Sequence, residues 1–141
     1  MTSRESELDQ MNRRLRGTDA VAEASVAARA FGDAQWLAPD ELARLCIVVE
    51  ELVANLYEHG GVSETDDIDL GFASDPLGIR VTIVDPGQPF DPWEMSRKVE
   101  RPDRGGGAGI EIVRAWAQFV DYDVTDQCNT LQLLLPVRWE G

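Results

Sequence analysis

Histidine and cysteine are scarce in this sequence, which contains one histidine and two cysteines. The single histidine, His59, excludes a multi-histidine metal site, and the cysteines lack the close spacing of zinc ligands. Cys46 falls within an apolar helical pattern, whereas Cys128 falls in a turn-like segment. We therefore predict neither a disulfide nor a zinc site.

Positive charge is also in short supply, because 13 basic residues stand against 26 acidic ones and the net charge is -13. Such a chain repels nucleic acid phosphates and anionic membranes, and it favours a partner with a basic surface. No apolar run approaches membrane-spanning length, and the N-terminal segment has no apolar signal core. We expect a cytoplasmic protein that binds neither nucleic acid nor membrane.

The chain is long enough for a substantial core. It has 141 residues, of which 43% are hydrophobic, as is usual for a globular fold. We find no internal repeat, low-complexity tract or linker. Residues 1–141 are therefore predicted to form a single domain.

Two helices are predicted in the first half of the chain. The alanine-rich run 19–31 has helical propensity, with Thr18 or Asp19 as its N-cap and Gly32 as its end. The run 39–59 begins with a proline suited to the first helical turn, carries a continuous apolar face and ends at two glycines.

Alternating apolar residues predict strands at 68–74 and 79–85, joined by the turn D-P-L-G as an antiparallel hairpin. Two later runs, 122–125 and 130–136, are also strand-like and are joined by the turn D-Q-C-N. Residues 1–17 fit either a short helix or an irregular strand, and the pattern leaves that choice open.

Between the hairpin and the later strands, 86–109 is rich in proline and glycine and is predicted to be a long functional loop. Basic residues gather in it, although the chain is otherwise acidic: Arg97, Lys98, Arg101 and Arg104. A third helix is predicted to follow, with one apolar face made of Ile112, Val113, Trp116, Ala117 and Val120.

The first candidate for chemistry is a polar stripe on the second helix, where Glu51, Asn55 and His59 recur at four-residue steps and share one side. An amide oxygen can hold Mg²⁺ on phosphates, and a carboxylate can orient a nucleophile, as phosphoryl transfer requires. In isolation such a stripe is more often a solvated helix face, and His59 fits an interaction with the dipole at the helix end as well as it fits a catalytic role.

Two further clusters are candidates for nucleotide contacts. Asp85 ends a hydrophobic strand, so its carboxylate could accept a hydrogen bond from an exocyclic amine such as that of adenine, while Gly87 would let backbone approach a ring. The other cluster precedes the third helix and could admit phosphate oxygens to backbone N–H groups: Arg104, Gly105, Gly106, Gly107 and Gly109. Alone, each is also compatible with a simple turn or a hinge.

Four motifs, taken in their order along the chain, resemble the GHKL ATPase and kinase superfamily: E-x-x-x-N-x-x-x-H-G, D-x-G-x-x-F-D-P, G-G-x-G-I-x-I-V-R and N-T-L-Q-L. Within it the chain is most similar to the small anti-sigma factor serine/threonine kinases of partner-switching systems, over residues 18 to 137. The resemblance implies a Bergerat-type ATP-binding α/β fold. In this two-layer α+β sandwich, helices cover one face of a mixed, mostly antiparallel sheet.

The resemblance also implies roles for individual residues. Glu51 would be the catalytic base and Asn55 the residue that coordinates Mg²⁺. The adenine contacts implied are Asp85, Gly87 and Thr130, and the phosphate contacts are Arg104, Gly105, Gly107 and Gly109. The chain departs from the family at Pro89, where many members have a second glycine, and at Gln118 in the predicted third helix, where the kinases often have an acidic residue.

The function implied is that of an ATP- and Mg²⁺-dependent serine/threonine kinase. It would phosphorylate a small anti-anti-sigma partner of the STAS type and sequester a sigma factor, as a homodimer. An alternative is a nucleotide-gated protein that sequesters its partner without phosphorylating it. A histidine kinase domain is disfavoured, because the chain shows no upstream dimerisation helix with a phosphoacceptor histidine.

Overall fold

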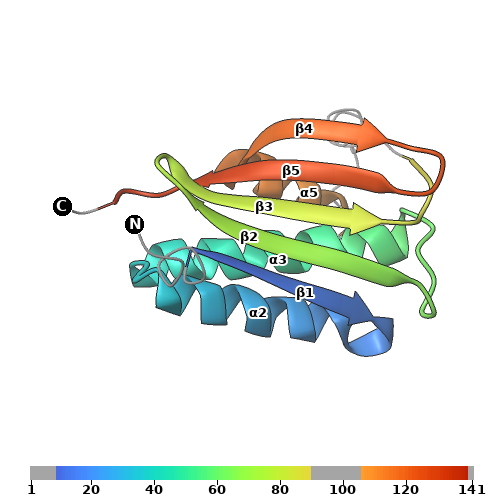
Figure 1. The fold of residues 1–141 in the computed structure, drawn as a ribbon, viewed down its shortest axis with the longest axis horizontal. Helices are drawn as coiled ribbons and strands as arrows, with labels where there is room; N and C mark the ends of the chain where they lie inside the picture. The colour runs from blue at the N-terminus through green and yellow to red at the C-terminus, as the bar shows by residue number, and fades with distance from the viewer. Residues whose placement is uncertain (1–8, 90–105, 140–141) are drawn as a thin grey trace.

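The sheet of this protein has five strands in the order β1-β2-β3-β5-β4, and every neighbouring pair is antiparallel (Figure 1). The computed structural model describes residues 9–89 and 106–139. The strands are β1 (Gln10–Arg16), β2 (Asp67–Asp75), β3 (Gly78–Asp85), β4 (Gln118–Val124) and β5 (Asn129–Pro136).

Helices lie on one face of this sheet (Figure 1). They are α2 (Ala20–Ala34), α3 (Pro39–Glu58) and α5 (Gly106–Trp116), with a short 3₁₀ turn, η1 (Gly17–Asp19), before α2. The predicted two-layer α/β fold is confirmed. The sheet was predicted to be mixed and mostly antiparallel, and all of its described strands pair antiparallel. Among these helices none has the length and apolar content needed to span a bilayer.

The core lies between the sheet and the helices, and the alternation of the central hairpin builds it. In β2 and β3 every second side chain is buried, as in Leu70 and Val81, and the register pairs Phe72 with Val81. Phe72 also stacks on Phe31 of α2, with ring centroids 5.4 Å apart. Burying one such side chain contributes roughly 1.5–3 kcal/mol, so this ring contact helps to fasten α2 to the sheet.

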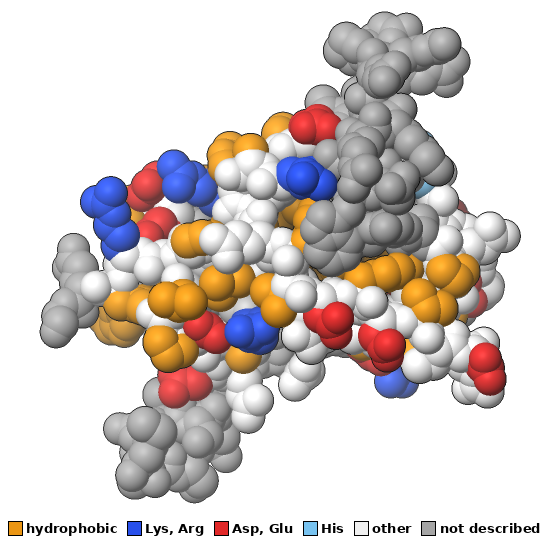
Figure 2. Space-filling model, turned by 90° about the horizontal axis from the view of Figure 1, so that it is seen from above, with side chains coloured by type: hydrophobic (Ala, Val, Ile, Leu, Met, Phe, Trp, Pro, Cys, Tyr) orange, Lys and Arg blue, Asp and Glu red, His pale blue; other side chains and the backbone are white. Residues whose placement is uncertain are grey.

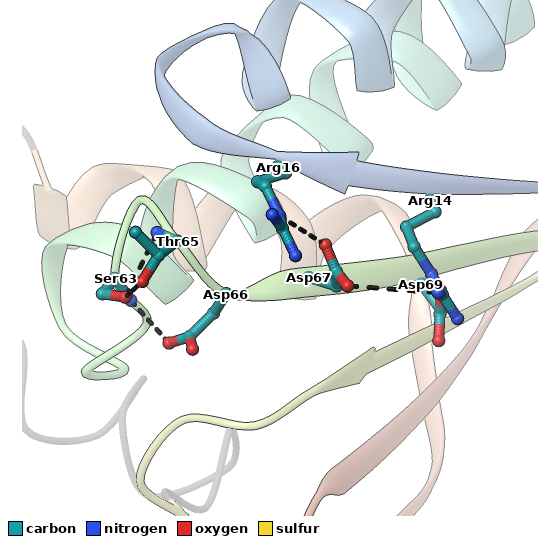
Figure 3. A network of polar contacts seen from close by, with 7 residues as sticks. All are labelled: Arg14, Arg16, Ser63, Thr65, Asp66, Asp67 and Asp69. Carbon is teal, nitrogen blue, oxygen red and sulfur yellow. Dashed lines mark hydrogen bonds and ion pairs between the residues drawn. The ribbon is translucent and has the colours of Figure 1, made fainter.

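The N-terminal segment, which the sequence left undecided, forms the edge strand β1 on β2 (Figure 3). Arg14 Nε lies 2.9 Å from Asp69 Oδ1, and Arg16 Nε lies 2.7 Å from Asp67 Oδ1. The hydrogen bond from Arg16 lowers the pKa of the Asp67 carboxyl. Exposed pairs of this kind stabilise little, but they favour this register over a shifted one. The feature of the sequence that indicates β1 is therefore the opposite charge of paired residues on β1 and β2, and not an alternation of apolar residues.

The third helix differs from its prediction at both ends. α5 already begins at Gly106, so the predicted loop does not extend to residue 109. Its last backbone hydrogen bond joins Ala117 N–H to Val113 O, and Gln118 and Val120, which were predicted to be helical, belong to β4. A register shift between Phe119 and Asp121 lets β4 pair with β5. Because this irregularity interrupts the alternation expected of a strand, the start of β4 was predicted as a continuation of the helix.

β4 is the second edge of the sheet. Asp121 and Asp123 are exposed on it, as are Val120 and Val124. Figure 2, which looks onto this side of the molecule, shows acidic side chains among apolar and uncharged ones, with some of them beside Lys or Arg side chains. Charged side chains on an edge strand oppose further strand pairing, so these carboxylates protect the free edge of β4.

Gly32 does not end α2 as predicted; it lies buried inside the helix. A Cβ at this position would come within 2.4 Å of Leu42 Cδ1, so the glycine allows α2 and α3 to approach closely. The helix ends two residues later. Leu37 N–H donates to Gly32 O and Trp36 N–H donates to Asp33 O, at 3.1 Å each. These bonds form a Schellman motif whose left-handed residue is Trp36, with φ 61°.

Replacing Trp36 with glycine is expected to stabilise the fold. The Trp36 side chain is 92% exposed, and its backbone adopts a conformation that costs an L-residue about 1–2 kcal/mol. Relief of this strain exceeds the entropy that glycine adds to the unfolded chain, so we expect a net gain of about 0.5–1 kcal/mol in the free energy of unfolding. Urea denaturation measures it. Trp36→Ala is the matched control, because it removes the indole and retains the Cβ; an equal gain in that variant would contradict the strain explanation.

Candidate functional site

Three segments that are far apart in the sequence meet at one end of the molecule, where β3 ends, β5 begins and α3 ends (Figure 1). The β3–β5 register places Asp85 opposite Asn129. Gln88 N–H, just after β3, donates to Gly60 O at 2.8 Å, and Gly60 N–H in turn donates to Asn55 O at 3.1 Å. The end of the sheet is thus tied by backbone hydrogen bonds to the polar end of α3.

Asp85 is a buried acid at this end, with 5% of its surface exposed. Its Oδ2 accepts hydrogen bonds from Gly87 N–H at 2.9 Å and from Asn129 Nδ2 at 3.3 Å. Burial raises the pKa of the Asp85 carboxyl, and these two donors oppose that rise. Oδ1 receives no hydrogen bond from the described residues, so one oxygen of a buried carboxylate remains to accept from a ligand.

The sequence interpretation missed Asn129. This side chain is 2% exposed, and its Nδ2 donates to Gly87 O at 3.0 Å as well as to Asp85. A signal was present in the sequence, because Asn129 has the same alternation as the buried Leu131 and Leu133 and therefore faces the helices. A polar residue in that series indicates a buried polar partner.

Thr130, the predicted adenine contact of this strand, is not brought to Asp85. It pairs with Val84 on β3 and with Asp123 on β4. Because successive side chains of a strand point to opposite faces, Thr130 faces away from the side that Asn129 and Asp85 share. The predicted motif lies at the same strand end as Asp85, but the side chain that contacts Asp85 is that of the preceding residue, Asn129.

Gly87 is required here for a reason other than the predicted approach to a ring. A Cβ at this position would lie 2.2 Å from Gly60 O and 2.9 Å from Asp85 Oδ2. The missing side chain therefore lets the turn after β3 rest directly on the backbone at the end of α3. Without that contact, neither the Gln88–Gly60 hydrogen bond nor the Gly87 donor to Asp85 would keep its geometry.

Gly87→Ala is expected to lower the free energy of unfolding by about 1–3 kcal/mol, because the atom in its way is a backbone carbonyl that cannot rotate aside. Thermal or urea denaturation measures this change. Gly71→Ala is the matched control: its Cβ would meet Asn12 Oδ1 at 2.8 Å, but this is a side-chain atom on an edge strand and can move. Equal losses in the two variants would contradict a specific role of the Gly87–Gly60 contact.

The polar stripe of α3 divides into residues with different environments. Asn55 is buried, with 4% of its surface exposed, and its Nδ2 has no hydrogen-bond partner in the described part of the chain. A buried amide without a partner costs about 1–3 kcal/mol, which indicates a group that a ligand completes. His59 instead forms the C-cap of α3 and is exposed, with its Nε2 3.8 Å from Glu58 Oε2.

Two adjacent glutamates on α3 are distinguished by their contacts. Glu50 Oε2 accepts a hydrogen bond from Ser25 Oγ at 2.6 Å, so this carboxylate fastens α3 to α2. Glu51 is half-buried and has neither a hydrogen bond nor an ion pair to the described residues. It lies one helical turn before Asn55, so the two side chains emerge on the same side of α3. Of these two glutamates, Glu51 is the one whose carboxylate has no partner among the described residues.

The predicted phosphate contacts are only partly within the described residues. Gly107 and Gly109 lie in the first turn of α5, where backbone N–H groups have no partner inside the helix and attract anions. Arg104 and Gly105 lie outside the described residues, as do the basic residues 97, 98 and 101. Over the ranges that are described, no cluster of three or more His, Cys, Asp or Glu side chains could hold a metal ion.

Comparison with known families identifies the class of protein to which this chain belongs. Residues 16–135 match the model of the histidine kinase-like ATPase domain, and the protein belongs to that family because the match spans most of the chain. The superfamily indicated by the sequence motifs is thereby confirmed. No curated protein matches the chain. The buried Asp85 and Asn55 and the half-buried Glu51 thus belong to an ATP-binding domain of the kinase-like class.

Proposed function

We propose that this protein is an ATP-dependent serine/threonine kinase that acts as an anti-sigma regulatory factor and phosphorylates a small anti-anti-sigma partner of the STAS type. The observation that carries the proposal is the buried Asp85 carboxylate, whose Oδ1 takes no hydrogen bond from the described residues. The family supports binding of ATP, and the order of the sequence motifs supports this branch of it.

In this proposal Asp85 recognises the base. Its Oδ1 accepts a hydrogen bond from the 6-amino group of adenine. The 6-oxo group of guanine at the same position has no hydrogen to donate and cannot form this bond. The other carboxylate oxygen, Oδ2, accepts hydrogen bonds from Gly87 N–H and from the Asn129 side-chain amide. The N-terminal turn of α5, with Gly107 and Gly109, and the preceding Arg104 and Gly105 are assigned to the phosphates.

The described residues fit a Mg²⁺ ion that is shared with the nucleotide. Asn55 Nδ2 has no hydrogen-bond partner among the described residues, so the amide is not held in place by them and its oxygen can turn toward an ion. Because no cluster of acids stands among the described residues, phosphate oxygens and water would supply the other ligands, as is common for Mg²⁺. When bound, this ion neutralises charge on the transferring phosphoryl group.

Glu51 is assigned to the nucleophile. Its free carboxylate accepts the proton of a serine or threonine hydroxyl on the partner, whose oxygen forms a bond to the γ-phosphorus. The bond between that phosphorus and the β,γ-bridging oxygen breaks, and ADP leaves. Glu51 lies one turn of α3 from Asn55, so the base and the proposed metal ligand are held on one rigid element.

We also propose that the protein is a cytoplasmic homodimer whose second task is to sequester a sigma factor. The net charge of -13 supports a protein partner with a basic surface and disfavours direct contact with nucleic acid. Phosphorylation of the anti-anti-sigma partner then decides which of the two partners the dimer holds.

Calorimetric titration with Mg-ATP, followed by incubation with labelled ATP and a STAS-type anti-anti-sigma protein from the same source, tests the proposal. We expect ATP binding and a labelled serine or threonine on the partner. Binding without label would replace the kinase with the alternative function, a nucleotide-gated protein that sequesters its partner. Absence of ATP binding would overturn both.

A further inference from the structure

We propose that Asn129 is a positioning residue that makes this site specific for a 6-aminopurine. It does so by fixing the Asp85 carboxylate with one oxygen turned toward the base. The inference rests on the proposed nucleotide function and adds to it the residue that sets the choice of base. Asn129 is one of three buried polar side chains in the described part of the chain, together with Asp85 and Asn55.

Both partners of the Asn129 amide nitrogen are acceptors. Nδ2 lies 3.3 Å from Asp85 Oδ2 and 3.0 Å from Gly87 O, so each of its two N–H bonds has one acceptor. A carboxylate and a carbonyl oxygen cannot donate to the Asn129 oxygen, which fixes the orientation of the amide. A single side chain thus ties the end of β3, the turn that follows it and the start of β5.

Asp85 Oδ2 is consequently occupied by two donors, Gly87 N–H and Asn129. The carboxyl group cannot rotate without losing both, and the negative charge on Oδ1 remains available to a donor on the base. Both donors also oppose the rise that burial causes in the Asp85 pKa, and so they favour the ionised, accepting form. A protonated Asp85 would itself donate and would tolerate the 6-oxo group of guanine.

The strand register makes position 129 the only residue of β5 that is suited to this role. Asn129 is the residue paired with Asp85, and both face the helices, whereas the next residue, Thr130, faces the other side of the sheet. A side chain that lacks two donors cannot bridge the carboxylate and the Gly87 carbonyl. Asn129→Ala and Thr130→Ala are therefore a matched pair on the same strand.

The experiment compares the dissociation constants of ATP, GTP and purine riboside triphosphate, which lacks the 6-amino group, for the intact chain and each variant. We expect the intact chain to prefer ATP over the purine analogue by about 10- to 100-fold, as for a hydrogen bond to a buried charge. Asn129→Ala should reduce that preference to within about threefold while leaving the affinity for the purine analogue nearly unchanged. Thr130→Ala should keep the full preference.

Asn129→Ser is a second variant in case the alanine protein does not fold. Its hydroxyl has one hydrogen to donate, so we expect an intermediate preference for ATP. If Asn129→Ala or Asn129→Ser weakens all three nucleotides equally, Asn129 is merely structural and the inference is overturned; full retention of the ATP preference overturns it as well. If the intact chain binds no nucleotide, the proposed function itself fails, and this result is distinct from a loss of discrimination.

Discussion

Asp85→Asn is expected to weaken ATP binding by about 10- to 100-fold without destabilising the fold. The asparagine oxygen can accept from Gly87 N–H and Asn129, as Asp85 Oδ2 does, and this turns the new amide nitrogen toward the ligand. That nitrogen donates and meets the 6-amino group of adenine, which also donates. The affinity for GTP relative to ATP should therefore rise, and calorimetry with both nucleotides measures the change.

The stability of the same variant follows from the pKa of Asp85. Burial raises this pKa above the ordinary value of an aspartate, so the folded protein binds the proton more tightly than the unfolded chain does. The carboxyl group therefore lowers the free energy of unfolding as the pH rises above about 4, through its folded pKa. Asp85→Asn removes this pH-dependent decrease in the free energy of unfolding. We therefore expect the variant to be at least as stable as the original protein at pH 7, as measured by urea denaturation.

Asp75 gives the matched control at the opposite end of the β2–β3 hairpin. A hydrogen bond from Leu77 N–H, followed by one from Arg80, lowers the pKa of Asp75. Its contribution is present above the unfolded pKa and is lost as the pH falls through the folded pKa. Asp75→Asn should lower stability at pH 7 and leave ATP affinity unchanged. A loss of stability in Asp85→Asn as large as that in Asp75→Asn would contradict the explanation.

The regular elements with a strong apolar period could be predicted from the sequence. The β2–β3 hairpin and α3 appear where alternation and helical periodicity indicated them, because one face of each is buried. β1 could not, because its edge position leaves Leu15 as its only fully buried residue and its register depends on arginines that pair with β2. Gly32 was misread because a glycine that permits close helix packing looks like one that ends a helix.

At the site, residue types could be predicted and their partners could not. Asp85 and Gly87 were identified from a local turn motif, but the contact between Gly87 and Gly60 joins segments that only the fold brings together. Choosing Asn129 over Thr130 required the register of β5 against β3. The stripe on α3 was predicted from helical periodicity, which does not indicate burial. In the structure Asn55 is a buried amide and His59 is an exposed helix end.

Glu51→Gln is expected to lower phosphoryl transfer by about 10²- to 10⁴-fold, the usual contribution of a general base, while Mg-ATP affinity stays within about twofold. Glutamine keeps the size of the side chain but cannot take the hydroxyl proton. Transfer of labelled phosphate to the STAS-type partner measures the rate, and calorimetry measures binding. The two readouts separate chemistry from nucleotide affinity, because the substitution breaks no hydrogen bond or ion pair between Glu51 and the described residues.

Glu50→Gln is the matched control for Glu51→Gln, since the two residues are adjacent on α3 and carry the same charge. The amide oxygen of the Glu50 variant can still accept from Ser25 Oγ, so the contact between α2 and α3 is retained. We expect transfer close to that of the original protein. Equal loss in the two variants would indicate that net charge on this helix, rather than a base at position 51, supports the reaction, and unchanged transfer in Glu51→Gln would remove Glu51 from the mechanism.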